Sequence, residues 1–294
     1  MNHGLNRHLL PLASLALLPL LAQAETIDQV VPLNADGMAV IKVVKGEVRV
    51  TGWDRNEIQI RGDLGEGSDR LLVEGNSQRR EIEVRIPRRS RDVEGTELEL
   101  RVPSGASIAV ETTSADIFVD GLAGTLVELK AVSGDIEVEA GGERLFAHTV
   151  SGDIEMESTS RRVDINTVSG DVDARANAEE ADVNTVSGEV LFISRELARS
   201  HIESVSGDME LDLGVAESGS VTIASLSGDV DVILPDDLSA TCEAESFSGS
   251  IRSAHGEVQK AKYGPHKTLR FVQGSGSGRL RIESFSGDVR IRNH

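Results

Sequence analysis

The amino-acid sequence predicts an all-β protein, a single-stranded β-solenoid (β-helix) with coils of 18–21 residues and looser capping strands at its N-terminal end. Three observations support this fold class. The tripeptide Ser-Gly-Asp recurs at steps of 18 to 21 residues, apolar and polar residues alternate around it, and no long segment has the 3.6-residue period of a helix. Aromatic residues make up only 3% of the chain, which suits a narrow interior filled by smaller side chains.

The first 24 residues are typical of a secretory signal peptide. Arg7 precedes an apolar run over residues 9–21, and Ala22 and Ala24 supply the small residues of a cleavage site. The run is shorter than the ~20 apolar residues that a membrane-spanning helix needs. We therefore expect cleavage after Ala24, a periplasmic or extracellular location, and no stable membrane span in the mature chain.

The rest of the chain is expected to form one continuous structural domain with two regions. Residues 25–105 carry looser strands that should start and cap the solenoid, and residues 106–294 carry the repeats. The closing segment around Gly274–Gly278, followed by Leu280–Glu283, is expected to cap the opposite end of the stack.

The repeated tripeptide is expected to form one corner of each coil. Glycine permits backbone angles that a Cβ would resist, and Ser and Asp side chains bond nearby backbone groups of a turn. Ala115, Glu189 and Ser250 replace the usual residue at single corners, and the step from Gly249 to Gly287 is two periods long, so one coil there has lost its motif or contains an insertion. The corner residues are Ser133, Gly134, Asp135, Ser151, Gly152, Asp153, Ser169, Gly170, Asp171, Ser187, Gly188, Glu189, Ser206, Gly207, Asp208, Ser227, Gly228, Asp229, Ser286, Gly287 and Asp288.

Short strands are expected on both sides of each corner. Ile154 and Met156 follow a corner at alternate positions, and Val163 and Ile165 precede the next one in the same way, so each strand has one apolar face. Such a coil cannot bury that face alone, whereas stacking at ~4.8 Å buries a continuous core. A further apolar residue two positions before each glycine breaks the alternation, which predicts a bulge or bend there. These residues are Val132, Val150, Val168, Val186, Val205, Leu226, Phe247 and Phe285.

Charge and cysteine content limit the possible partners. The formal net charge is −19, which makes nucleic acid and anionic membrane surfaces poor partners. Cys242 is the single cysteine, so no internal disulfide can form, and we expect it in the core. The expected partner is an envelope protein or a polysaccharide, and the oligomeric state stays open.

The pattern resembles a bacterial domain family of unknown function described as "putative adhesin", with β-strand repeats. The resemblance rests on the recurring Val-Ser-Gly-Asp-Val motif, on Gly46–Val48 followed by Gly52–Asp54, and on Leu98–Pro103 before the repeats. It implies an exported or envelope-associated β-solenoid without an established ligand. It brings no catalytic residues, so none is assigned, and no cofactor is expected.

A calcium-binding surface repeat protein is one alternative. Stacked corners would place carboxylates ~5 Å apart, and calcium favours several carboxylate oxygens at once. Turn formation explains the same residues without a metal, so we assign no metal ligands. The acidic corner residues are Asp116, Asp135, Asp153, Asp171, Glu189, Asp208, Asp229 and Asp288.

A β-helix polysaccharide lyase or hydrolase is the other alternative. That chemistry uses carboxylates with Lys or Arg in a groove. The coils are nearly uniform, and the chain has one Trp and one Tyr to hold a sugar. We therefore favour a non-catalytic scaffold or adhesin-like binding module.

Two smaller groups stay as hypotheses. His255 and His266 lie in the irregular double-length step, where they could meet at a metal, although two histidines in a loop are more often solvated. Arginines between Arg79 and Arg91 could bind anionic groups of an envelope polymer, although they could equally form ion pairs with acidic residues of the protein itself.

Overall fold

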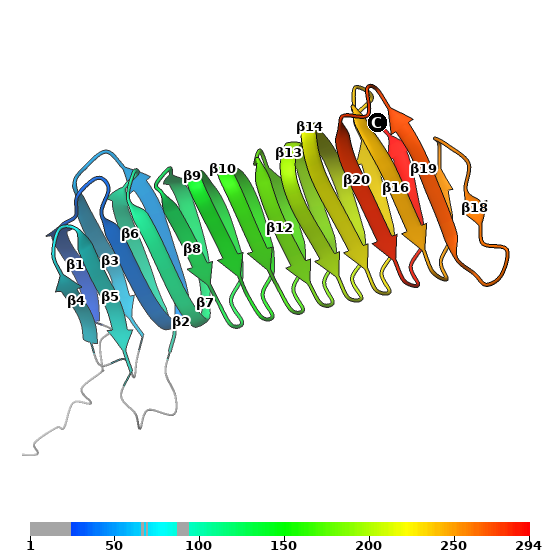
Figure 1. Ribbon diagram of the computed structural model, residues 1–294. Coiled ribbons are helices and arrows are strands. Elements are labelled where there is room, and N and C mark those ends of the chain that lie inside the picture. The colour runs from blue at the N-terminus through cyan, green and yellow to red at the C-terminus, as the bar shows by residue number, and fades with distance from the viewer. Residues whose placement is uncertain (1–24, 66–67, 69, 87–93) are drawn as a thin grey trace, which may run out of the picture.

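The structure is a computed structural model that describes residues 25–65, 68, 70–86 and 94–294 (Figure 1), so the predicted signal peptide lies outside the described residues. Every regular element in this part of the chain is a β-strand, and the all-β prediction is confirmed. The strands are β1 (Glu25–Pro32), β2 (Met38–Trp53), β3 (Glu57–Leu64), β4 (Arg70–Gly75), β5 (Arg79–Arg85), β6 (Thr96–Pro103), β7 (Ser107–Leu122), β8 (Leu126–Lys130), β9 (Ile136–His148), β10 (Ile154–Asn166), β11 (Val172–Ala176), β12 (Glu180–Thr185), β13 (Val190–Ser204), β14 (Met209–Ser225), β15 (Val230–Leu234), β16 (Ala240–Ser246), β17 (Ile251–Ser253), β18 (Gln259–Lys260), β19 (Lys267–Gln273), β20 (Gly278–Ser284) and β21 (Val289–Asn293).

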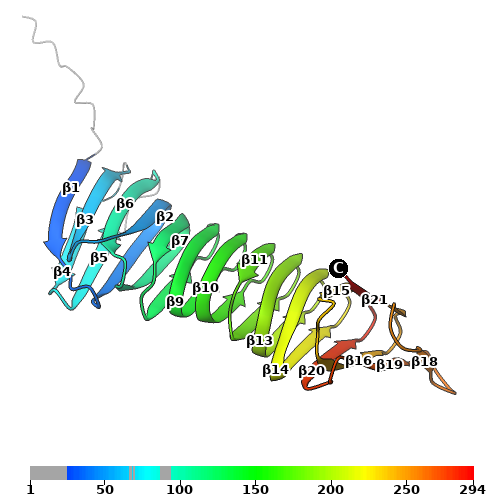
Figure 2. The ribbon, with the colours of Figure 1, turned by 90° about the horizontal axis from the view of Figure 1, so that it is seen from above.

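The strands stack side by side into an elongated rod (Figures 1 and 2). In its middle, successive coils pair in parallel and in register, so that Ile154 of β10 lies opposite Ile136 of β9 on one side and Val172 of β11 on the other. The incoming strands repeat this arrangement, with Val163 of β10 opposite Ala181 of β12. The architecture is β-solenoid-like.

The core runs along the inside of the rod as the alternation predicts. In β10 buried and exposed side chains alternate from Ile154 onward, and Ile154 and Met156 are at most 1% exposed. Phe192 is the largest fully buried side chain, and small or β-branched residues fill most of the interior. Each buried aliphatic side chain of this kind contributes about 1.5–3 kcal/mol.

At the N-terminal end, the first long strand does not lie at the edge of the stack. β2 pairs in parallel with β5 and β6 on one side and with β7 on the other. The outer layer consists of β5 and β6 together with β1, β3 and β4, which pair antiparallel in β1–β3, β3–β6 and β4–β5.

At the C-terminal end, the last coil enters the stack between two earlier ones. β20 pairs in parallel with β14 and with β16, and β21 pairs in the same way with β15 and β17. The expectation that Leu280–Glu283 caps this end is therefore wrong. Leu280 and Ile282 are at most 1% exposed, because an apolar face of this strength is buried best between two neighbouring coils. The end is covered by the double-length step, whose β19 pairs antiparallel with β16 and with β18.

Close stacking requires glycine at the corners. A Cβ built on Gly170 would lie 1.8 Å from the carbonyl oxygen of Gly152, and the same clash repeats from corner to corner. The φ of Gly170 is not positive. The expectation that glycine is needed here for a backbone angle that a Cβ would resist is therefore wrong, and the close approach of the neighbouring coil is the reason. Ala115, which stands at the first such corner and is fully buried, lies opposite Gly46 of β2.

Candidate functional site

The candidate site is an exposed row of apolar side chains along one edge of the rod, which we call the apolar stripe. Its members are 37–54% exposed, and most of the exposed large apolar side chains of the described residues lie in it. In their order along the stack they are Val132, Val150, Val168, Val186, Val205, Leu226, Phe285 and Phe247.

The corner geometry turns these residues outward. Thr167, 4% exposed, faces the interior, and its Oγ1 accepts the backbone N–H of Gly170 at 3.0 Å. This bond closes a tight turn, which leaves Val168 and Ser169 between its ends facing water. The predicted bend is confirmed, since β10 ends at Asn166 and β11 begins at Val172.

The corner serines fix the spacing of the apolar stripe. Ser169 Oγ donates to the carbonyl oxygen of Val150 at 3.3 Å, and Ser227 Oγ donates to that of Val205 at 3.1 Å. The same bond forms at the other corners, so every stripe residue except Phe247, at the end of the row, is held by the serine of the next coil. The stripe is therefore as regular as the backbone stack, with neighbours ~4.8 Å apart.

The stripe becomes wider and aromatic at its C-terminal end. The rings of Phe285 and Phe247 stack with centroids 5.0 Å apart and planes 7° apart. Leu226 is next to Phe285, because the N–H of Ser286 donates to the carbonyl oxygen of Leu226 at 3.1 Å. The insertion of β20 and β21 thus brings the most apolar corners together.

A shallow groove follows the stripe on one side. One part, of about 340 Å³, lies between Val168 and Val186 on one wall and Asn166 and Asn184 on the other. A second part, of about 520 Å³, is lined by Leu226 and the two phenylalanines of the stripe. Glu203 and Val205 line both parts, so the groove is continuous from coil to coil.

The corner carboxylates form a hydrogen-bonded row on the other side of the stripe. Asp153 Oδ1 accepts the backbone N–H of Asp171 at 2.8 Å, and Asp171 Oδ1 accepts that of Glu189 at 2.8 Å. At the end of the row, the N–H of Ser250 donates to Asp288 at 2.8 Å and lowers the pKa of that carboxyl. One oxygen of most corner aspartates is therefore engaged in tying one coil to the next.

The remaining candidate ligands do not gather at one point. Across residues 25–65, 68, 70–86 and 94–294, no group of three or more His, Cys, Asp or Glu side chains is arranged to hold a metal ion. His255 Nε2 lies 2.8 Å from Asn293 Oδ1, and the His255 ring stacks on Phe271, whereas His266 Nε2 lies 3.9 Å from Glu245 Oε2.

The arginine cluster is only partly described. Arg80 donates to the carbonyl oxygens of Pro32 and Gly75 at 3.1 and 2.8 Å, so this guanidinium ties two N-terminal segments together. Arg88, Arg89 and Arg91 lie outside the described residues.

Two other single residues are placed by the structure. Cys242 is 1% exposed in the core, as predicted, and burial raises the pKa of its thiol to about 12. His148 Nε2 lies 3.1 Å from Asp164 Oδ1, and this hydrogen bond lowers the pKa of the Asp164 carboxyl.

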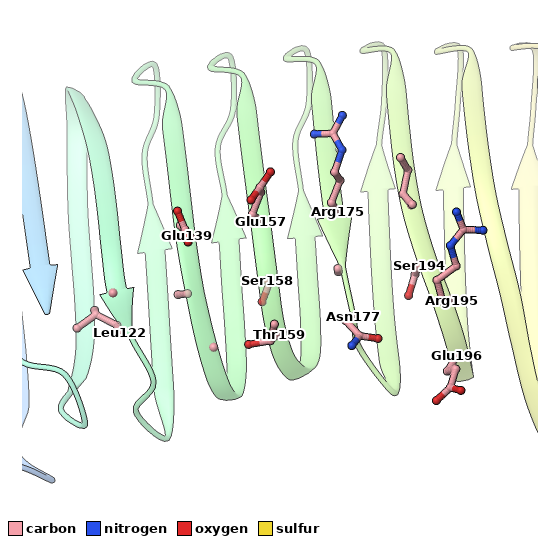
Figure 3. Close-up of a pocket in the computed structure, with 15 residues that line it drawn as sticks. Leu122, Glu139, Glu157, Ser158, Thr159, Arg175, Asn177, Ser194, Arg195 and Glu196 are labelled. Carbon is pink, nitrogen blue, oxygen red and sulfur yellow. The ribbon is translucent and has the colours of Figure 1, made fainter.

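A further groove, of about 820 Å³, lies near the opposite turn of the coils, and the sequence did not point to it (Figure 3). Glu139 and Glu157 line it from paired positions on neighbouring coils, together with Arg175 and Arg195. Arg195 is engaged by Asp212, whose two oxygens accept its Nη1 and Nη2 at 2.9 and 3.0 Å. This groove is the nearest counterpart of the carboxylate-and-arginine groove that a polysaccharide-cleaving enzyme would use.

The sequence located the stripe residues without revealing their exposure. The break in alternation showed that the chain bends, but the direction of the bend depends on the inward hydroxyl of Thr167 and its equivalents. Two adjacent outward positions, such as Val168 and Ser169, were the available signal.

None of the described residues forms a helix long and apolar enough to cross a membrane.

Comparisons with known proteins agree on the architecture. The profile of the Toastrack DUF4097 family matches residues 39–292. No curated protein matches the chain in sequence. A solved structure of a "putative lipid binding protein" from Parabacteroides distasonis is similar with a TM-score of 0.54 and 12% identity over 92% of this chain and 96% of that one. A "putative adhesin" from Parabacteroides merdae is similar with a TM-score of 0.53 and 10% identity, over 92% and 96% of the two chains.

Proposed function

Because the chain belongs to the Toastrack DUF4097 family, we propose that it is an exported, envelope-associated and non-catalytic scaffold or binding module that presents the apolar stripe to a partner. The signal-like residues 1–24 support export. The in-register pairing of coils supports a single-stranded β-solenoid with coils of 18–21 residues as the rigid support.

One observation carries the proposal: the stripe places eight large apolar side chains in one exposed line, each 37–54% exposed. Contiguous apolar surface on a soluble protein costs solubility and marks interaction sites. The hydrogen bonds of the corner serines already fix the backbone of the stripe before a partner binds. Binding therefore costs little conformational entropy of this backbone.

The names of the similar structures support the same class of function. One is named as a binding protein and the other as an adhesin, and neither name describes catalysis. At 10–12% identity this likeness shows a shared fold, so the ligand of this chain has to be sought in its own surface.

Site-specific crosslinking tests the proposal. A photoreactive amino acid replaces Leu226 in the stripe or, as a control, Val272 of β19, which is 60% exposed and outside the stripe. We expect the full chain, expressed in a bacterial host, to give envelope adducts from position 226 and not from position 272. Equal adducts from both positions, or none from either, would contradict a stripe-directed binding module.

A glycan assay tests the non-catalytic part of the proposal. Purified protein is incubated with uronate-containing and neutral envelope polysaccharides, and we expect no new reducing ends or unsaturated products. Cleavage that disappears in Glu157→Gln, which alters the groove lined by Glu139 and Glu157, would establish the lyase or hydrolase alternative instead.

A further inference from the structure

We propose that the apolar stripe and the adjacent corner carboxylates together form a docking surface for a cationic amphipathic α-helix, lying along the axis of the rod. This inference rests on the proposed function, because it names the chemistry of the partner that the same stripe would bind.

Two parallel rows define the surface. In each corner except that of Phe247, which has Ser250, the stripe residue stands three positions before the acid, as Val150 does before Asp153 and Val168 before Asp171. Serine–carbonyl bonds hold the first row and carboxylate–amide bonds the second, so both repeat with the ~4.8 Å spacing of the stack. The result is an apolar line beside an anionic line of the same period.

The anionic line is not neutralised by the protein itself. Among the described residues, none of the five central acids forms an ion pair with Lys, Arg or His. Those acids are Asp153, Asp171, Glu189, Asp208 and Asp229.

Other faces of the rod use basic residues to pair their acids. Asp231 bonds both Arg290 and Arg292, and Glu180 bonds Arg162 and Arg199. Not every acid on these faces is paired, since Glu137, Glu155 and Glu157 also form no ion pair among the described residues. The corner acids differ from them in lying next to the exposed apolar row.

Charge complementarity selects the partner. Nucleic acid, anionic lipid and uronate polymers would be repelled by this row in a chain of net charge −19. A neutral apolar partner would cover the carboxylates without pairing them, which is costly. Lys and Arg can rest their alkyl stems on the valines while their charged ends reach the acids.

The period of the surface selects a helix among cationic polypeptides. One helical turn rises ~5.4 Å, close to the ~4.8 Å between coils, whereas an extended chain advances ~3.3 Å per residue. Apolar side chains at positions i, i+4 and i+7 therefore fall near successive stripe residues over several turns. The segment from Val150 to Leu226 offers enough successive coils for such a helix.

Peptide binding to the full mature chain tests the inference. The probe is a fluorescent Leu/Lys peptide of about 18 residues, five turns, with one apolar face; the controls are a scrambled peptide of the same composition and a Leu/Glu counterpart. By fluorescence anisotropy we expect the amphipathic Leu/Lys peptide alone to bind, roughly tenfold or more weaker when NaCl rises from about 50 to about 500 mM. Equal binding of the scrambled peptide, or binding insensitive to salt, would overturn the inference.

Matched variants locate the site. Asp153→Asn, Asp171→Asn and Asp208→Asn remove three charges but keep an acceptor for the backbone N–H, and this triple variant should bind roughly tenfold or more weakly. The control triple variant Glu137→Gln, Glu155→Gln and Glu157→Gln removes the same charge from the strand face and should bind normally. Equal weakening in both would show non-specific attraction and refute the docking surface.

The apolar row is tested in the same way. Replacing Val168, Val186 and Val205 by Thr, which keeps the β-branched shape, should weaken binding, whereas Val272→Thr should not. Unchanged binding of the valine triple variant would exclude the stripe as the docking line. Melting temperatures of all variants show whether the fold is retained.

The two proposals fail in distinguishable ways. Adducts from position 226 without peptide binding would leave the binding module standing and refute the cationic helix as its partner. Stripe-dependent binding to neutral phosphatidylcholine vesicles, with no peptide binding, would assign the surface to lipid and likewise refute it. Absence of both adducts and peptide binding would reject both proposals.

Discussion

Phe285 stacks on Phe247 at 5.0 Å between ring centroids, although 38 positions separate them in the chain. The contact exists because β20 enters the stack beside β16. It therefore reports both on the path of the chain and on the surface that the stripe presents.

The aromatic pair should be energetically coupled, because the two rings stack. Phe247→Ala and Phe285→Ala each leave the core intact, because the two side chains are 50% and 54% exposed. A double-mutant cycle of urea unfolding should give a coupling of about 0.5–1.5 kcal/mol. A coupling of zero would show that the rings do not stack in solution.

Gly170 should tolerate no side chain. The Cβ of Gly170→Ala would lie 1.8 Å from the carbonyl oxygen of Gly152, so the coils must separate there. We expect a loss of unfolding free energy several times the ~1 kcal/mol of an ordinary substitution. The control is Gly121→Ala, whose Cβ has 3.7 Å of space and whose φ of 70° costs about 1 kcal/mol or slightly more. Equal midpoints of denaturation in the two variants would contradict close stacking at the corners.

Leu280 should behave as a residue of the central core. It is fully buried in β20 between two coils, so Leu280→Ala should cost about 2–5 kcal/mol, as Leu211→Ala should in β14. Chemical denaturation compares the two variants directly. A cost below ~1 kcal/mol for Leu280→Ala alone would mean that the last coil lies at the periphery.

Asp164 should make stability depend on pH in the acidic range. The hydrogen bond with His148 lowers the carboxyl pKa below its ordinary 3.8 in the folded protein. A group with a depressed folded pKa contributes stability above its unfolded pKa and loses it as pH falls through the folded value. The stability difference between the protein and Asp164→Asn should therefore be full near neutral pH and shrink below about pH 4. Urea midpoints from acid to neutral pH measure it, and in a His148→Ala background the pH-dependent part should largely disappear.

Calcium should leave the melting temperature unchanged. Asp153 and Asp171 each use one carboxylate oxygen to accept a backbone N–H of the next coil, which leaves the corners poorly prepared to surround an ion. Binding to the folded state alone would raise the melting temperature by linkage. A rise in millimolar calcium that is absent in millimolar magnesium would favour the calcium-binding alternative.

The strands and corners could be predicted because each coil repeats the same local physics. Alternation at Ile154 and Met156 identifies a strand with one buried face, and the spacing of the glycines indicates which residues lie opposite each other. Hydroxyls such as that of Thr167 recur as regularly, although their role in closing the turn becomes visible only with the backbone of Gly170 in place.

The order of the coils could not be predicted, for the same reason. Ile282 and Ala244 occupy equivalent positions in their coils, and either strand could pair with Ile223 of β14 through identical backbone bonds. Nothing local distinguishes an inner coil from an end coil when all share one pattern. The groove at Glu139 and Glu157 was missed because it arises from the shape of the turn opposite the motif.

The insertion of β20 and β21 also governs how the protein can be made. During synthesis from the N-terminus, β14 and β16 are complete before β20, and the native order of the strands is reached only when residues 278–284 insert between them. A chain that ends before residue 278 consequently lacks an inner layer, so that β14 and β16 either keep unpaired edges, which proteases attack, or pair with each other one layer too early.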